Sequence, residues 1–400
     1  MVDWYFLSVI LFFGIIAAII YKDRKKIDIS HKVIFMRRTK RFGDMIDWVA
    51  QLSPKFWKIV GTIGIIVCLY LMFNGLNLLV NLSSYVLSGY VDEPAFQLIL
   101  PVPFVQSTTG PGFIGIPFWF WIITIAFILI PHEFFHGIMA RADKVKLKSV
   151  GLVLFAIFPG AFVEPDEKQL SKKKLLTKLR VFAAGSFMNI MIAMVILSAT
   201  QAFLWEPNVG TGVTIGEIIE GTAAERAGLK SGMMIEKINN IPMEIGYADY
   251  SYIMINTPDS MSEDITIYSA SHLLSSRLLA YEAGDEIILT ADGKDYNIIL
   301  GENPDYEELP YLGVRNPDLN VENKDMFFSV FPLLAFIWLL SLAVATVNIL
   351  PMYPLDGGLM LKAVTDKYLK KHSDLIVKIM SYGILLVLLF NFFGPVLLNL

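Results

Sequence analysis

The five residues His132-Glu133-Phe134-Phe135-His136 have the types and the spacing of a metal site that activates water. On a helix, residues four apart lie on one face, so both imidazoles can bind the same zinc ion. The glutamate between them lies close to such an ion and can act as general base toward water. The preceding stretch, Phe118–Pro131, is almost wholly apolar. Ionisable groups at membrane depth are costly and mark functional sites, so we predict a catalytic zinc site rather than a chance match.

A third protein ligand is needed, because a catalytic zinc usually has three. The best candidate is Asp356, in the stretch Asn348–Gly358 at the end of an uncharged apolar run. Pro351 and Pro354 each break a helical hydrogen bond, and the two glycines after Asp356 allow close packing. Alone, this stretch fits equally well a turn that ends a span and a carboxylate that turns inward. Its pairing with an intramembrane His-Glu-x-x-His favours the ligand.

The composition indicates the elements that hold these residues. Of 400 residues, 55% are hydrophobic and 18% charged, with a mean hydropathy of +0.56, which is typical of a polytopic membrane protein. The one cysteine, Cys68, excludes an intrachain disulfide and a four-cysteine zinc site, and we interpret it as a small buried residue. The segment Met1–Ile20 lacks the basic start and cleavage site of a signal peptide, so we expect a retained anchor.

We expect about six transmembrane helices. The candidate spans are Trp4–Ile20, Phe56–Val80, Phe118–Met139, Val181–Leu204, Met326–Leu350 and Leu375–Leu398. Basic residues cluster after the first, third and fifth spans, within residues 22–41, 141–174 and 362–371. The positive-inside rule then places both termini outside the cytoplasm. We interpret the basic run Lys22–Arg41 as a topology signal that faces anionic lipid headgroups.

The charge is distributed very unevenly along the chain. Residues 205–325 contain 22 acidic and 7 basic residues, which leaves 15 acidic and 26 basic residues for the remainder. The acidic part therefore reads as a soluble region outside the cytoplasm, and the basic part as spans with cytoplasmic loops.

Two further stretches, Leu98–Pro117 and Gly151–Pro165, are apolar but broken by proline and glycine. We expect both to be re-entrant or interfacial loops beside the metal site. At membrane depth, irregular backbone is tolerated only where protein or water satisfies its hydrogen-bonding groups.

The motif pair resembles the site-2 protease family of intramembrane zinc metalloproteases. The resemblance rests on His132–His136 and on Asn348-Ile-Leu-Pro-Met-Tyr-Pro-Leu-Asp356-Gly. It is supported by Pro159-Gly-Ala-Phe-Val-Glu164 and by Ala184-Gly-Ser-Phe-Met-Asn189, and it covers the spans from Phe118 onward.

This resemblance implies a catalytic core made of the third, fourth and fifth spans. It makes His132, His136 and Asp356 the zinc ligands and Glu133 the general base. Asn189 resembles the family's core asparagine, which is proposed to steady the tetrahedral oxyanion; an interhelical hydrogen bond is the alternative. Asn348 resembles the asparagine that contacts the extended substrate backbone, and capping of the broken helix is the alternative.

The acidic region looks like a PDZ domain, which is itself a site-2 protease arrangement at this position. Residues 212–215 read as a strand, residues 221–232 as a short helix ending at Gly228 and a turn at Gly232, and residues 233–240 as a strand. A helix at Ser269–Ala283 and strands at 285–289 and 295–300, joined at Asp292-Gly293, would complete it. Met233 replaces the usual aspartate, and Ile241–Tyr268 is longer than the usual connection. The groove could capture a peptide C-terminus or an extended strand, or the domain could be a cap without a ligand.

We therefore expect a polytopic α-helical membrane protein with an inserted soluble PDZ-like α/β domain. Its expected parts are 1–116, a two-span region with a basic cytoplasmic loop; 117–204, the first part of the catalytic core; 205–320, the PDZ-like domain; 321–374, the second part of the core; and 375–400, a C-terminal span.

The expected function is zinc-dependent cleavage of the transmembrane segments of membrane proteins, with the PDZ-like domain gating or recognising substrates. The alternatives are an inactive membrane-bound PDZ adaptor and a metal transporter. The transporter would need polar residues along a whole path, and the intact Glu133 argues against the adaptor. His31, His272 and His372 lie in polar contexts and read as solvated. The sequence carries no nucleic-acid-binding motif, so we do not expect a nucleic acid as a partner.

Overall fold

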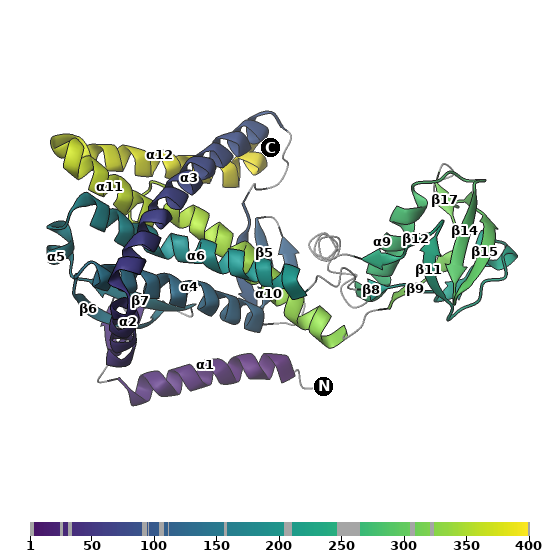
Figure 1. The fold of residues 1–400 in the computed structure, drawn as a ribbon, viewed down its shortest axis with the longest axis horizontal. Coiled ribbons are helices and arrows are strands. Elements are labelled where there is room, and N and C mark those ends of the chain that lie inside the picture. Colours follow the sequence, from purple (N-terminus) through teal and green to yellow (C-terminus); the bar gives the residue numbers. More distant parts are fainter. Residues whose placement is uncertain are drawn as a thin grey trace. The chain divides into compact units, whose positions relative to one another are not determined.

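The computed structural model describes residues 4–24, 27–30, 34–89, 94, 96–103, 108–110, 112–155, 158–203, 210–245, 265–304, 309–320 and 324–398. The chain forms two compact units, one of residues 1–197 with 336–400 and one of residues 198–335 (Figure 1). The first unit contains the long apolar helices and the second contains most of the acidic region.

The membrane candidates are helices. They are among the following helices, given in chain order: α1 (Trp4–Lys22), α2 (Lys40–Leu52), α3 (Pro54–Leu87), α4 (Phe118–Ala142), α5 (Glu167–Ser171), α6 (Leu175–Phe203), α10 (Lys324–Ile349), α11 (Asp356–Tyr368), a 3-10 turn (Lys370–His372) and α12 (Ser373–Leu398). Among the described residues, five of these helices are long and apolar enough to cross a membrane: α1, α3, α4, α6 and α12. The expected span Met326–Leu350 falls on α10, whose described apolar part is the shorter segment Leu333–Ile349.

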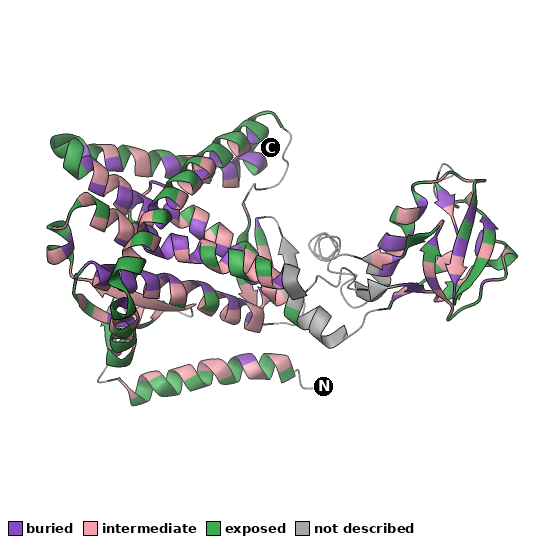
Figure 2. Cartoon of the chain, viewed as in Figure 1, coloured by how far each residue is buried: buried purple, intermediate pink, exposed green. Residues whose placement is uncertain are grey.

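The outward faces of these helices are apolar, as lipid requires. Figure 2 shows large exposed stretches on α3 and α12. They include Ile66 and Phe73 on α3 and Leu386 on α12, with exposures of 67%, 71% and 66%. An apolar surface of this extent is unusual for a soluble monomer and fits contact with a bilayer.

The hydrophobic core of this unit joins α2, α3, α4 and α6. Ile46 of α2 is fully buried, and a Cβ added at Gly137 of α4 would lie 2.9 Å from its Cδ1. Cys68 of α3 is buried as predicted, and its Sγ donates to the Ala183 carbonyl of α6 at 3.4 Å. The helix that carries the two histidines is thus held on several sides.

The stretch Gly151–Pro165 is not the irregular loop that we expected. Strands β6 (Leu147–Phe155) and β7 (Phe158–Pro165) form an antiparallel hairpin, in which backbone groups bond to each other instead of needing a cavity. Strands β1 (Ile27–Ser30) and β2 (Ile34–Arg38) extend it to a sheet of order β1-β2-β6-β7. A Cβ at Gly151 would lie 2.2 Å from the Arg37 carbonyl oxygen, so glycine lets β2 approach β6.

The stretch Leu98–Pro117 also contains strands where we expected an irregular segment. Strand β5 (Phe113–Pro117) lies between β3 (Leu98–Val102), which is parallel to it, and β4 (Thr108–Gly110), which is antiparallel. Residues 104–107 and 111 lie outside the described part. Because β5 continues directly into α4, this small sheet fixes where α4 begins.

The second unit is built on a sheet of order β15-β14-β11-β9-β19, with β12 beside β11. Its elements are β8 (Gly210–Thr211), β9 (Val213–Thr214), β10 (Glu217–Ile218), α7 (Ala223–Arg226), β11 (Met234–Ile238), β12 (Ile241–Pro242), β13 (Glu244–Ile245), α9 (Ile265–Leu278), β14 (Glu286–Ala291), β15 (Lys294–Ile299), β16 (Gly301–Glu302), β17 (Pro310–Tyr311), β18 (Val314–Arg315) and β19 (Asp318–Leu319). Apolar residues of β9, β11, β14, β15 and α9 form one buried core.

Local signals located the elements of this unit well. The short helix is followed by Gly228 at φ +78°, and the turn before β11 contains Gly232 at φ +86°. The β14–β15 hairpin turns at Asp292 and Gly293, both with positive φ, as the Asp-Gly signal predicts. The predicted second helix begins four residues earlier than expected, at Ile265. Most of the long connection Ile241–Tyr268 lies outside the described residues.

Candidate metal centre and active site

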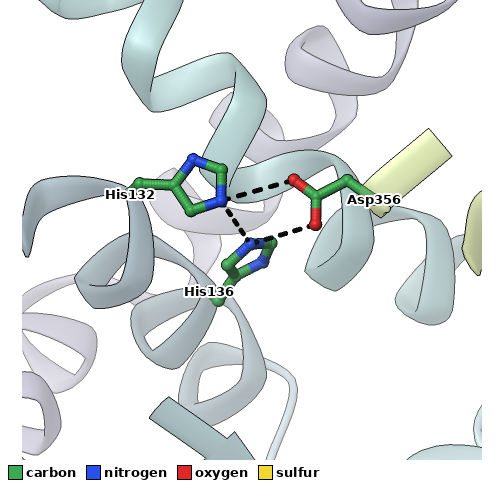
Figure 3. A group of neighbouring side chains, drawn as sticks. All are labelled: His132, His136 and Asp356. Atoms are coloured by element: carbon green, nitrogen blue, oxygen red, sulfur yellow. Dashed lines mark hydrogen bonds and ion pairs between the residues drawn. The ribbon is translucent and has the colours of Figure 1, made fainter. Parts of the chain in front are cut away.

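The structure brings together His132, His136 and Asp356, although Asp356 is far away in the sequence (Figure 3). The Nε2 atoms of the two histidines are 3.2 Å apart. Asp356 Oδ2 lies 3.5 Å from His132 Nε2, and Asp356 Oδ1 lies 3.4 Å from His136 Nε2. The side chains are only 6%, 13% and 11% exposed. Three ligand atoms thus face one small buried volume.

Two helices and one helix break position these three groups. His132 and His136 stand four residues apart on α4, and His132 directly follows Pro131. Helix α10 ends at Ile349, and Asp356 is the first residue of α11, after a turn that contains both prolines. The predicted break is therefore present, and it turns the carboxylate toward the histidines.

The two glycines after Asp356 permit this turn. A Cβ at Gly357 would lie 1.8 Å from the Ile349 carbonyl oxygen, and one at Gly358 would lie 2.4 Å from the Met352 carbonyl carbon. Any larger residue would push the start of α11 away from the end of α10. The close packing that the sequence suggested is thus a requirement of the backbone itself.

One face of α6 contacts all three candidate ligands. Val181, Gly185 and Asn189 recur every four residues on this helix, and Ser186 lies beside them. The Val181 carbonyl lies 2.6 Å from His136 Nδ1, and the Asn189 amide nitrogen lies 3.0 Å from His132 Nδ1. The Ser186 hydroxyl donates to Asp356 Oδ2 at 2.9 Å. Helix α6 therefore contacts the Nδ1 atom of each imidazole and also the carboxylate.

The donor set fits a divalent transition metal. Two imidazole nitrogens and one carboxylate are a usual catalytic zinc set, and here their ligand atoms all lie within 4.8 Å of one another. The Val181 carbonyl can accept a hydrogen bond from His136 Nδ1–H, which leaves the Nε2 lone pair for a metal. At Gly185, a Cβ would lie 2.3 Å from His136 Nε2 and 2.4 Å from His132 Nε2, so the missing side chain keeps this volume open.

Glu133 lies on the same helix as the two histidines, but its carboxylate bonds to strand β7. Its Oε2 accepts a hydrogen bond of 3.0 Å from the Val163 N–H of β7. The β6–β7 hairpin therefore lies beside the His-Glu-x-x-His motif, where we had expected a loop. Strand β7 packs along α4. Glu164, the next residue of β7, accepts hydrogen bonds from Ser149 and Lys148, which hold the pKa of this carboxyl below its ordinary value.

The two asparagines differ in their surroundings. Asn189 is fully buried and lies against His132, whereas Asn348 is half-buried near the end of α10. Among the described residues, none of the three ligands shares a hydrogen bond with the Asn348 side chain. Sequence reasoning overlooked Val181, Gly185 and Ser186 as site residues. The four-residue spacing of Gly185 and Asn189, which matches that of the two histidines, is a signal that could have found Gly185.

The other histidines belong to no such group. His272 and His372 are exposed, on α9 and on the 3-10 turn, and His31 lies outside the described residues. In the described part of the chain, His132, His136 and Asp356 are the one cluster of three or more metal-binding side chains.

Comparison with known families now adds to this geometry. The sequence pattern of peptidase family M50, the site-2 protease family, matches residues 120–392. The chain belongs to this family. The match contains α6, α11 and all but the first two residues of α4, and these helices carry every residue of the cluster and its hydrogen-bond partners. This M50 protein has several candidate membrane spans, and peptidases of its family are typically zinc-dependent.

An archaeal relative gives no functional detail. The uncharacterized protein MJ0971 of Methanocaldococcus jannaschii is 32% identical over 182 residues, which are 44% of this chain and 46% of that protein. The chain thus spans about half the length of this curated relative.

Proposed function

We propose that this M50 protein is a zinc-dependent intramembrane endopeptidase that cleaves transmembrane segments of membrane proteins. The observation that carries the proposal is the convergence of His132, His136 and Asp356 at a buried point between candidate membrane helices. Ionisable side chains inside a membrane cost free energy, so a cluster of them between membrane helices indicates a functional site. Family membership supports the reaction class.

In this proposal, His132, His136 and Asp356 hold the zinc ion and Glu133 moves the proton. A zinc ion bound there would supply Lewis acidity, which would polarise a peptide carbonyl and let water give up a proton near pH 7. Glu133 takes a proton from the attacking water and returns it to the leaving nitrogen as the C–N bond breaks. The Asn189 amide can donate a hydrogen bond to the oxyanion that develops on the carbonyl oxygen.

The substrate must be unwound before it can react. A transmembrane helix uses its peptide carbonyls in its own hydrogen bonds, so they are shielded from the metal. Strand β7 is at the edge of its sheet and lies next to Glu133, so it could pair with an extended peptide. Asn348, beside the helix break, would then contact the extended substrate backbone, as the family resemblance suggests.

Stiffening the substrate should therefore slow cleavage. We expect a single-span test substrate with leucines in place of helix-destabilising residues around its cleavage site to be cut more slowly than the parent. The reason is that local unwinding then costs more free energy, since leucine is a strong helix former. Cleavage rates of the two substrates in the same detergent give the answer, and equal rates would contradict the need for unwinding.

For residues 205–320 we propose a PDZ-like domain outside the cytoplasm that screens substrates. The order of strands and helices in the second unit supports it, as does the core that they share. A peptide C-terminus or an extended strand is the ligand that such a groove would take. The clusters of basic residues support a multi-pass protein in the cell membrane with both termini outside.

Zinc content tests the proposed function most directly. We expect about one zinc ion per chain in detergent-purified protein and a loss of zinc in His136→Ala, because two ligands bind zinc far less well than three. The matched control is His372→Ala, which removes an exposed histidine remote from the cluster and should keep the zinc. A folded wild type without zinc would contradict the proposal and favour the adaptor alternative.

A further inference from the structure

Both histidines of the cluster hydrogen-bond to α6, and His132 bonds to the Gly185 backbone as well as to Asn189. His136 Nδ1 lies 2.6 Å from the Val181 carbonyl oxygen, and His132 Nδ1 lies 3.0 Å from the amide of Asn189. Both imidazoles therefore point Nε2 toward Asp356 and Nδ1 toward α6. The partner of His136 is a backbone oxygen, which no substitution removes, but one partner of His132, Asn189, is a side chain.

The chemistry of a metal ligand fixes what Asn189 must do. If His132 Nε2 gives its lone pair to a cation, the neutral ring carries its proton on Nδ1. That N–H needs an acceptor, and the Asn189 side chain lies at hydrogen-bond distance from Nδ1. An amide presents either its oxygen or its nitrogen at the same place after a half-turn about its last torsion, so the oxygen can face Nδ1.

We propose that Asn189 is the positioning residue of His132. Its amide oxygen accepts the Nδ1–H bond, which holds the ring in the tautomer and orientation that presents Nε2 to the metal. This inference rests on the proposed metal site. It gives Asn189 a role in the resting protein, before a substrate is present, in addition to any role toward the oxyanion.

The burial of Asn189 supports this role. The residue has no exposed surface, and one of its two amide atoms has no partner in the described part of the protein. A buried amide is costly unless it is bonded, so the bond to His132 is the reason for having it there. The half-turned amide leaves its NH2 group at the unpartnered position, where a donor would be available to an incoming carbonyl oxygen.

Three variants test the inference. Asn189→Leu keeps the size but removes the acceptor, and we expect its zinc dissociation constant to rise about 10- to 100-fold, as for other partners of ligating histidines. Asn189→Asp keeps an oxygen acceptor at the same place and should bind zinc at least as tightly as the wild type. The matched control is Asn391→Leu, because Asn391 is also a fully buried amide on a membrane helix, bonded to Ser83 and Val387.

The measurement uses the full chain in detergent and Zn²⁺ alone, with a competing chelator, so no substrate is needed. The visible spectrum of the Co²⁺-substituted protein reports the ligand geometry, which should change in Asn189→Leu and remain in Asn189→Asp. Wild-type zinc affinity in Asn189→Leu would overturn the inference, as would equal losses in Asn189→Asp or in Asn391→Leu. If Asn189→Leu does not fold, Asn189→Ala, which also removes the acceptor, takes its place under the same criterion. A wild type that binds no zinc would instead refute the proposed function.

Discussion

Glu133→Gln is expected to keep about one zinc ion per chain and to lose nearly all cleavage. Glutamine has the shape of glutamate, and its amide oxygen can still accept the 3.0 Å hydrogen bond from the Val163 N–H. The position of β7 beside α4 is thus preserved. The amide cannot take a proton from water, so the rate should fall by about 10²- to 10⁴-fold, the usual contribution of a general base.

The measurement pairs zinc content with cleavage of a single-span test substrate that the wild type cuts. The matched control is Glu164→Gln, the same change on the neighbouring residue of β7, whose carboxylate bonds to Ser149 and Lys148. It should leave both zinc content and cleavage near wild-type levels. Cleavage by Glu133→Gln at the wild-type rate would remove Glu133 from the role of base, whatever its zinc content.

The cluster of three candidate ligands was predictable because the signals for its members are local. The spacing of His132 and His136 implies a shared helix face wherever the helix lies. Asp356 was predictable because a carboxylate in an apolar span is costly unless it has a function, and the adjacent prolines and glycines let the chain turn it inward. The structure supplies what spacing could not, namely the 3.4 and 3.5 Å approaches of this carboxylate to the two imidazoles.

The α6 partners could not be predicted in the same way. Which face of α6 lies against α4 is not encoded by hydrophobic periodicity, because a membrane helix is apolar on all sides. Val181 contributes only its backbone carbonyl, so its side chain carries no signal at all. Ser186 is a common small residue in membrane helices, and only its 2.9 Å bond to Asp356 marks it.

The sheet around β6 and β7 was missed for a related reason. Short apolar runs with glycine and proline fit a strand as well as an irregular segment, and the pattern alone cannot separate them. The pairing of β2 with β6 joins residues more than a hundred positions apart. In the second unit, by contrast, the β14–β15 hairpin depends on adjacent residues, and the Asp292-Gly293 signal located it.

Gly185→Ala is expected to abolish zinc binding without weakening α6 as a helix. Within a helix, alanine is more favourable than glycine by roughly 0.5–1 kcal/mol, so local propensity favours the variant. The new Cβ, however, would lie 2.3 Å from His136 Nε2 and 2.4 Å from His132 Nε2, the two atoms that we expect to bind the metal. The rings cannot retreat without losing their bonds to Val181 and Asn189.

The matched control is Gly383→Ala on α12, where an added Cβ meets no atom within 4 Å. It makes the same chemical change in a membrane helix and should keep about one zinc ion per chain. Zinc content and thermal unfolding of both variants separate loss of the site from loss of the fold. Wild-type zinc affinity in Gly185→Ala would mean that α6 does not close this side of the metal centre. The proposed role of Asn189, which depends on the same closeness of α6 to α4, would then also be wrong.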